Sequence, residues 1–225
     1  MAESFSEKTI GYLVELRARN DREWYYAHKA DYERYVLKPF QSLVTALAPA
    51  IQRIDPEIET APAVGKTISR VYRDARFTHD KSLYRDRAWI TFERKIDAPD
   101  VPAFYFELTP ANYRYGVGFY NVSLRTMNEY RAMIDRGEDE FLCIIGDIAA
   151  AGVFSVEGES YKRSRYAGRH PEIAEWYDRK NIYIAANRAG LSEAFDFDAL
   201  ARRLEEGFSA LAEIYRYWLR AASLC

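Results

Sequence analysis

The segment between residues 66 and 87 concentrates side chains that bind anions. It holds seven Lys or Arg residues against three Asp, a formal charge of +4, which leaves −6 for the rest of the chain. Four of these cations fall within 12 residues: Arg70, Arg73, Arg76 and Lys81. An arginine fork binds phosphate or carboxylate through two hydrogen bonds, and lysine adds a point charge. The segment therefore predicts a site for a small anionic ligand, bearing phosphate or carboxylate.

Three neighbouring residues are expected to support the four cations: Asp74, Phe77 and Tyr84. Asp74 stands beside Arg73 and can fix the rotamers of the arginines around it. If a reaction is catalysed, His79 or Lys81 is the expected proton donor, and His79 with Asp80 forms the local acid–base pair. No particular reaction follows from these residues.

An internal ion-pair network would explain the same charges, because buried or half-buried arginines are usually paired. On a regular strand Arg70 and Arg73 would face opposite sides, which favours the network unless the strand ends near Tyr72. Both interpretations stay open at this point.

The segment also contains the pattern R-x-x-R-D-x-R-F followed, after three residues, by K-x-x-Y. Its fixed positions are filled by Arg70, Arg73, Asp74, Arg76, Phe77, Lys81 and Tyr84. In this pattern the sequence resembles a bacterial family of conserved hypothetical proteins, catalogued as domain of unknown function 2461. The resemblance extends to residues 20–25, where the family typically has N-x-R-x-W-F, and to residues 105–110, 116–118 and 170–171. The resemblance implies family membership over most of the chain. It implies no particular activity, because the activity of the family is not established.

A second basic stretch, residues 161–170, mixes tyrosines with arginines, a combination that can stack bases while holding phosphates. A flexible solvated loop is the alternative. A nucleic-acid or protein interaction module is therefore the second functional hypothesis. The net charge of −2 and the acidic remainder of the chain disfavour broad nucleic-acid binding. A domain in which the arginines are purely structural is the third.

Other chemistries find little support. The three histidines have no metal-ligand spacing, so no metal site is expected, and His28 is expected to be packed or hydrogen-bonded. Cys143 lies in an apolar run and is expected to be an inert core thiol. The glycines at 116 and 118 are a fragment of a nucleotide-binding pattern inside a predicted strand, where glycine more often permits close packing. No cofactor is predicted.

The overall composition indicates the kind of protein that carries this site. The 225 residues are 48% hydrophobic and 29% charged, as in globular domains, and 15% aromatic. We expect a cytoplasmic protein: the start lacks the pattern of a signal peptide, and two cysteines make no disulfide framework. The longest apolar-rich stretch, residues 141–154, is too short to span a bilayer, so no membrane partner is expected. The oligomeric state is not predicted.

Helical spacing and capping residues predict helices after Ser6, after Asn20 in a capping box with Glu23, and over residues 40–54. Alternation predicts strands over residues 66–73, 87–95, 104–108, 113–119 and 181–186. Further helices are expected over residues 124–136 and 138–151, and one long helix over 200–219. The prediction is a single α+β domain, residues 1–225, with a mainly antiparallel sheet packed by N-terminal and C-terminal helices.

Overall fold

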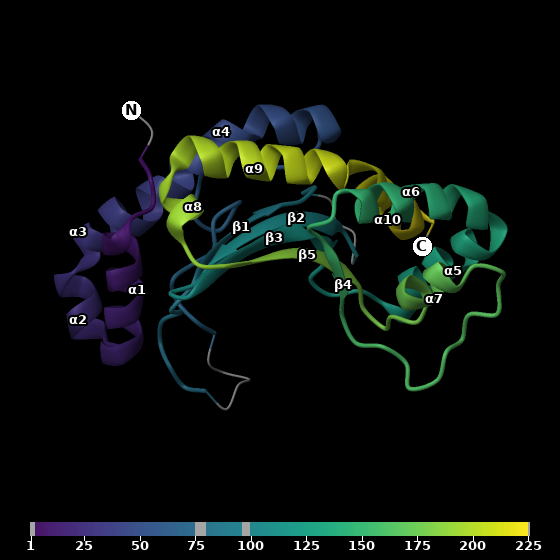
Figure 1. Ribbon diagram of the computed structural model, residues 1–225. Coiled ribbons are helices and arrows are strands. Elements are labelled where there is room, and N and C mark those ends of the chain that lie inside the picture. Colours follow the sequence, from purple (N-terminus) through teal and green to yellow (C-terminus); the bar gives the residue numbers. More distant parts are fainter. Residues whose placement is uncertain (1–2, 75–79, 96–99, 225) are drawn as a thin grey trace. The chain divides into compact units, whose positions relative to one another are not determined.

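Alternating apolar residues build a five-stranded antiparallel sheet in the computed structural model, which describes residues 3–74, 80–95 and 100–224. The sheet has the order β1-β2-β3-β5-β4 (Figure 1). Its strands are β1 (Ala88–Phe92), β2 (Pro102–Leu108), β3 (Asn112–Phe119), β4 (Ser155–Glu157) and β5 (Tyr183–Ala189). With helices at both ends of the chain, this is the α+β fold predicted from the sequence.

The period of two is visible in which side chains are buried. In β1 the side chains of Ala88, Ile90 and Phe92 are buried, and the two residues between them are less covered. β2 and β3 form the expected hairpin, in which the Thr109 N–H donates to the Asn112 carbonyl at 2.9 Å. The register of β4 with β5 is antiparallel and pairs Val156 with Ile184.

The glycines of β3 let the neighbouring strand come close. A Cβ added to Gly116 would lie 1.8 Å from the carbonyl oxygen of Ile184, and one on Gly118 would lie 2.1 Å from the Cβ of Tyr183. The close approach is thus to β5, and not to an aromatic side chain such as Trp89. Gly116 and Gly118 therefore allow the close packing of β3 against β5.

The chain divides into two compact units. Unit 1 comprises Met1–Phe92, Tyr105–Arg114 and Arg188–Glu205, and unit 2 comprises Glu93–Phe104, Tyr115–Asn187 and Glu206–Cys225. Strands β2, β3 and β5 and helix α9 (Phe197–Ala210) contribute residues to both. One domain over residues 1–225 stays a prediction.

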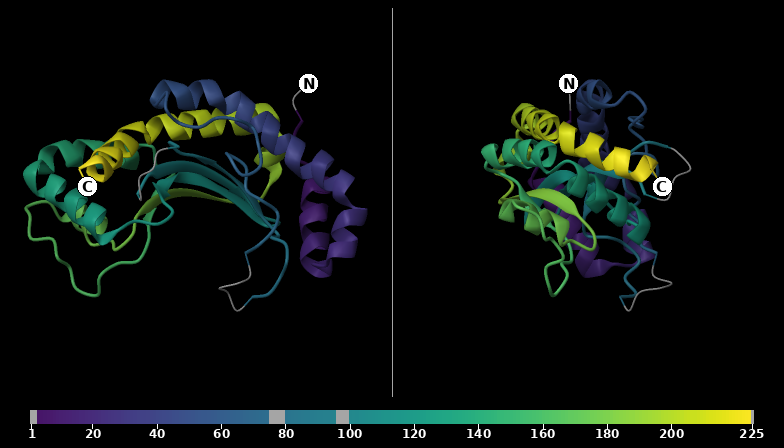
Figure 2. Two further views of the ribbon diagram at one scale, coloured as in Figure 1. Left: turned by 180° about the vertical axis from the view of Figure 1, so that it is seen from behind. Right: turned by 90° about the vertical axis from the view of Figure 1, so that its right-hand side faces the viewer.

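Unit 1 begins with a run of helices. They are α1 (Glu7–Arg19), α2 (Arg22–Ala27), α3 (Lys29–Tyr32), the π-helical η1 (Glu33–Leu37) and α4 (Lys38–Ile54), and the short α8 (Ser192–Phe195) follows later. Ser6 precedes α1 as predicted, and its N–H donates to Thr9 Oγ1 at 3.1 Å. From α3 to α4 the helical path is continuous, and α4 lies beside α9, where Arg53 near the end of α4 pairs with Glu205 at 2.5 Å (Figure 2).

Unit 2 holds the other helices. They are α5 (Leu124–Arg136), α6 (Glu138–Ala150), α7 (Pro171–Tyr177) and α10 (Ala212–Ser223). The predicted bounds of α5 and α6 are confirmed to within one residue. Ser123 caps α5 by accepting the Thr126 N–H at 3.1 Å, and Ser123 Oγ in turn donates to Asp100 Oδ2 at 2.5 Å. Among the helices of the described residues, none is both long and apolar enough to cross a membrane.

Two element predictions are wrong. Residues 66–73 contain no strand, because Gly65 (φ 80°) starts a tight turn in which its N–H donates to the Ile68 carbonyl at 2.8 Å. The long C-terminal helix is two helices, which separate at Leu211. The N–H of Leu211 is shared between the carbonyls of Gly207 and Phe208, each at 3.2 Å, and its ψ of 2° is not helical.

Candidate functional site

The basic segment of the family pattern folds into two extended arms, residues 70–74 and 80–87, which we call the first and second signature arms. They run antiparallel and pair at Tyr72 and Tyr84. Two backbone hydrogen bonds of 2.9 Å join them, from the Arg73 N–H to the Leu83 carbonyl and from the Arg85 N–H to the Val71 carbonyl. Three predicted site residues, Arg76, Phe77 and His79, lie outside the described residues.

Asn20 holds the second arm against the first helix. It ends α1 in the left-handed conformation (φ 40°), which asparagine tolerates better than most residues. Its Oδ1 accepts the N–H groups of Leu83 (2.6 Å) and Tyr84 (3.1 Å), and its Nδ2 donates to the Tyr84 carbonyl (3.0 Å). The predicted capping box of Asn20 with Glu23 is therefore wrong. Asp21 caps α2 instead, accepting the Trp24 N–H at 2.8 Å.

Arg73 is held by partners inside the signature arms. Its guanidinium forms an ion pair with Asp80 and a 3.3 Å hydrogen bond with Ser82 Oγ. Asp80 also accepts the Ser82 N–H at 2.9 Å. That backbone hydrogen bond is the largest cause of a lowered pKa of the Asp80 carboxyl, and Arg73 lowers it further. For Arg73, the geometry is that of the ion-pair network.

Arg85 also makes hydrogen bonds within the signature arms. Its guanidinium donates to the carbonyls of Arg70 (2.9 Å) and Tyr72, both on the first arm. It lies 5.0 Å from the ring centre of Trp89, a cation–π distance. The sequence showed Arg85 only as one more positive charge, because its partners are backbone carbonyls that no side-chain pattern reports.

Arg70 has different surroundings from Arg73 and Arg85. Its side chain is exposed and forms no ion pair with any residue that the structure describes. It lies against the turn at Gly65, where an added Cβ would be 3.4 Å from the Arg70 Nε. The neighbouring cation Lys66 pairs with Glu59 at 3.5 Å. Packing against a turn positions the Arg70 guanidinium and leaves its charge available.

Tyrosines surround the point where the signature arms meet α2. The Tyr25 ring stacks on Tyr84, with ring centres 4.6 Å apart, and the Tyr72 ring lies 5.1 Å from Tyr84. The hydroxyls of Tyr72 and Tyr26 are 3.5 Å apart, and these two residues are 45% and 62% exposed. The arms therefore present an aromatic surface that continues onto α2.

The tyrosine hydroxyls are held in their neutral form. Interaction with the Tyr26 hydroxyl is the largest cause that raises the pKa of Tyr72. Burial raises the pKa of Tyr84, a shift that Tyr72 and the positive charge of Arg22 partly offset. Neutral hydroxyls donate hydrogen bonds, which suits them to an anion.

The remaining predicted residues of the site, Asp74 and Lys81, are both exposed and lie at the ends of the two arms. The structure thus separates the predicted cluster: Arg70 and Arg73 belong to one arm but have different surroundings. Arg22, Tyr26 and Arg85 were not predicted. Arg22 and Tyr26 are four residues apart on α2, the spacing that places two side chains on one helix face.

The second basic stretch, residues 161–170, is fixed by internal contacts. Arg165 lies 4.6 Å from the Tyr161 ring centre, and its N–H donates to Asp178 Oδ1 at 2.7 Å. The Tyr166 hydroxyl donates to Glu138 Oε1 at 2.8 Å, which is the largest cause of a lowered pKa of that glutamate. Tyr161, Arg165 and Tyr166 are thus engaged within the chain, whereas the side chains of Lys162 and Arg163 are exposed.

Two single-residue predictions have opposite outcomes. His28 is packed and hydrogen-bonded as expected: its ring stacks 4.3 Å from Trp24, and Nδ1 lies 2.8 Å from the Trp24 carbonyl. The expectation of a buried Cys143 is wrong, since its thiol is exposed on α6. The apolar run around it is helical, so Cys143 falls on a different face from Phe141 and Ile145. In the described part of the chain no three His, Cys, Asp or Glu side chains gather as a metal site would.

The fold and site define an α+β protein whose most basic segment is a two-armed loop tied to the first helices by Asn20. A family model described as conserved hypothetical protein (DUF2461) matches residues 8–217. The chain belongs to this family. A comparison with curated proteins gave no match.

Proposed function

We propose that the protein binds a small anionic ligand, bearing a phosphate or carboxylate, on the signature arms. The observation that carries this proposal is the state of Arg70. Its guanidinium is exposed and forms no ion pair within the described residues, although its arm lies in the most basic segment of the chain. A fork of five N–H donors without a carboxylate partner is suited to a bidentate anion.

The extended backbone places an aromatic side chain next to this cation. Tyr72 follows Arg70 by two residues on the first arm, and both side chains are exposed. Arg73, by contrast, is held by Asp80 and Ser82. The ligand would meet Arg70 and Tyr72 together.

The tyrosines favour a ligand with a planar or apolar part beside its charge. Tyr72 and Tyr26 offer exposed rings and hydroxyls, and the exposed Arg22 is close enough to lower the pKa of Tyr84. Aromatic rings stack on planar groups, and their hydroxyls donate to oxygen atoms. Lys81, with Arg76 from outside the described residues, would add to the positive field. His79, also outside them, and Lys81 remain the candidates for proton transfer.

A purely structural role is supported for Arg73 and Arg85. Both are occupied by the loop, through Asp80 and through two backbone carbonyls. The same reasoning does not extend to Arg70. Nucleic-acid binding remains the second hypothesis, and the internal pairing of residues 161–170 adds no support to it. The proposed setting is the bacterial cytoplasm, whose reducing conditions suit an exposed free thiol at Cys143.

The test is a thermal-shift screen of phosphorylated metabolites, nucleotides and dicarboxylates on the wild-type protein and on Arg70→Gln. We expect at least one compound to raise the Tm of the wild type, since a ligand that binds only the folded state stabilises it. The shift should be lost in Arg70→Gln and kept in Arg202→Gln. Arg202 is an exposed arginine of α9 in unit 1 that makes no ion pair in the described part of the chain.

The unliganded Arg70→Gln protein should melt at the wild-type temperature, because no internal carboxylate loses a partner. If no compound stabilises the wild type, or if Arg70→Gln responds like the wild type, the proposal is wrong. A hit that weakens steeply with salt and occurs only with oligonucleotides would favour the second hypothesis.

A further inference from the structure

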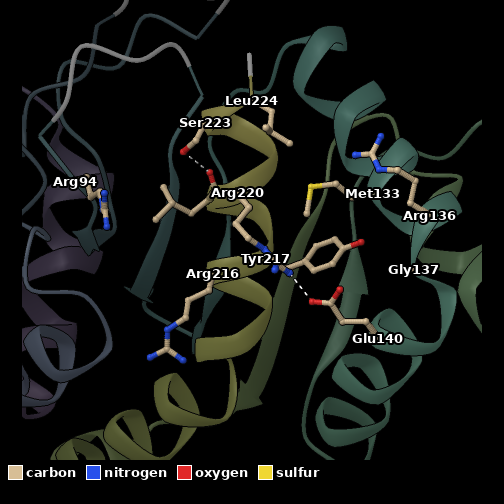
Figure 3. Close-up of a pocket in the computed structure, with 11 residues that line it drawn as sticks. Arg94, Met133, Arg136, Gly137, Glu140, Arg216, Tyr217, Arg220, Ser223 and Leu224 are labelled. Carbon is tan, nitrogen blue, oxygen red and sulfur yellow. Dashed lines mark hydrogen bonds and ion pairs between the residues drawn. The ribbon is translucent and has the colours of Figure 1, made fainter.

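Unit 2 contains a cavity that is remote in sequence from the signature arms. Its volume is about 760 Å³, and its walls come from α5, α6, α10 and the residue Arg94 after β1 (Figure 3). This volume is in the range of small-molecule sites. The position of the cavity is not marked by the family pattern, so the sequence gave no sign of it.

The charge of the lining is strongly positive. Four arginines line the cavity, Arg94, Arg136, Arg216 and Arg220, against the single carboxylate of Glu140. Glu140 pairs with Arg220 at 2.6 Å, and Arg216 pairs with Glu213 beside the cavity. Arg136, at the end of α5, is exposed and has no ion pair among the residues that the structure describes. The four arginines and one glutamate of the lining give it a formal charge of +3.

The rest of the lining is apolar or aromatic. Met133, Leu219 and Leu224 supply hydrocarbon surface. Tyr217 is only 1% exposed, and Figure 3 shows its ring with Met133 on one side and the Glu140 carboxylate on the other. The Arg220 guanidinium lies 5.1 Å from the centre of this ring. A cation over an aromatic ring, beside aliphatic side chains, suits a ligand with both a charge and a hydrophobic body.

The hydroxyl of Tyr217 is a buried polar group close to this charged lining. It is buried and has no hydrogen-bond partner among the described residues. Burial is the largest cause that raises its pKa, and Glu140 raises it further, while Arg220 and Arg136 lower it. A buried hydroxyl without a partner costs free energy.

We infer that this cavity binds an amphipathic phosphate monoester, with its phosphate on Arg136 and Arg220 and its apolar body against Met133, Leu219 and Leu224. A phosphate monoester carries a charge close to −2 at neutral pH, which the lining can neutralise. This site is separate from the one proposed on the signature arms, and either can exist without the other.

The experiment is calorimetric titration of the full chain with 1-naphthyl phosphate, 1-naphthol and inorganic phosphate. Binding of 1-naphthyl phosphate should be clearly tighter than that of the other two compounds. 1-Naphthol lacks the phosphate, and inorganic phosphate lacks the apolar ring. Arg136→Gln should weaken binding about tenfold, the loss expected for one charge-assisted contact. The matched control is Arg125→Gln, which removes an exposed arginine from the same helix outside the cavity and should bind as the wild type does.

Arg136→Gln breaks no ion pair of the described structure, so its Tm should equal that of the wild type. Arg70→Gln separates this site from the signature arms: it should leave naphthyl phosphate binding unchanged. The inference is overturned if Arg136→Gln binds like the wild type, if 1-naphthol binds as tightly as its phosphate, or if nothing binds. It is also overturned if Arg70→Gln, and not Arg136→Gln, removes binding.

Discussion

The side-chain amide of Asn20 brackets the backbone of Tyr84: Oδ1 accepts the Tyr84 N–H at 3.1 Å, and Nδ2 donates to the Tyr84 carbonyl at 3.0 Å. Asn20 begins the first segment of the family pattern, and Tyr84 ends the second. The two segments, 64 residues apart, are therefore parts of one structure. Asn20 therefore fixes the position of the second signature arm relative to α1 and α2. The first arm follows because it is paired to the second.

Replacing Asn20 by glycine should destabilise the protein by about 2 kcal/mol. Glycine keeps the left-handed backbone but leaves the N–H groups of Leu83 and Tyr84 without their acceptor, and a lost acceptor costs about 1–3 kcal/mol per donor, less where water replaces it. Urea unfolding measures the change. Asn20→Asp keeps the acceptor and should lose less, and the exposed Asn121→Ala is the control. Equal stability of Asn20→Gly and the wild type would show that this bracket contributes nothing.

Arg73→Gln and Arg70→Gln should differ in their effect on stability. Arg73→Gln removes the partner of Asp80 and should lower the Tm by a few degrees at most, roughly 1–3 °C, because partly exposed ion pairs contribute little. Arg70→Gln should leave the Tm unchanged. Differential scanning fluorimetry at low and high salt distinguishes them, since only the Arg73→Gln difference should shrink with salt. An Arg70→Gln protein that melts earlier than Arg73→Gln would contradict the assigned roles.

Lowering the pH should destabilise the folded state of unit 1, because it protonates the Glu193 carboxylate. The Tyr113 hydroxyl donates to this carboxylate at 2.5 Å and Arg203 at 3.0 Å, and the two together hold the pKa of Glu193 below its ordinary value of 4.5. A lowered pKa in the folded state means that the contribution is present above about pH 4.5 and is lost as the pH falls through the folded-state pKa. Below pH 5 the wild type should lose stability more steeply than Glu193→Gln.

Thermal unfolding between pH 3 and pH 7 (roughly the range in which carboxyls titrate) measures this slope. The control is Glu206→Gln, an exposed glutamate of α9 with no ion pair within the described residues, whose profile should follow the wild type. If the profiles of Glu193→Gln and the wild type stay parallel to acid pH, the Tyr113 and Arg203 contacts do not stabilise the charged carboxylate.

Gly116→Ala should be among the most damaging single changes. Its Cβ would lie 1.8 Å from the carbonyl oxygen of Ile184, a backbone atom of the neighbouring strand that cannot move without breaking the sheet. We expect a loss of more than about 3 kcal/mol, or no folded protein. In Gly146→Ala the new Cβ meets nothing within 4 Å on α6, and helix propensity predicts a gain of up to about 1 kcal/mol. Equal expression and Tm of the two variants would be inconsistent with this packing.

Local patterns predicted much of this fold. The helical period and the glycines after it gave α5 and α6, and alternation gave β1, β2 and β3. β4 was missed because three residues are too few to show a period. The strand predicted over residues 66–73 failed because a turn at Gly65, which costs glycine no strain, precedes Ile68 and leaves only isolated pairings.

The site was predictable in composition and not in arrangement. Charge counting found the basic segment. The two-residue period predicted opposite faces for Arg70 and Arg73 only on a regular strand, and residues 66–73 form none. It could not assign Asp80 to Arg73, nor bring Asn20 to Tyr84, because such contacts depend on how distant segments pair. The arginines of the unit 2 cavity come from two helices, Arg136 from α5 and both Arg216 and Arg220 from α10, and only helix packing brings these helices together.

The central claim is that Arg70 contacts an anion while Arg73 is occupied by Asp80. Its most direct test is NMR of the arginine Nε–Hε groups, assigned with Arg70→Gln and Arg73→Gln, during titration with the strongest compound from the thermal-shift screen. The account predicts that the Arg70 resonance shifts in a saturable manner and the Arg73 resonance stays in place. A shift of Arg73 with an unmoved Arg70 would contradict it.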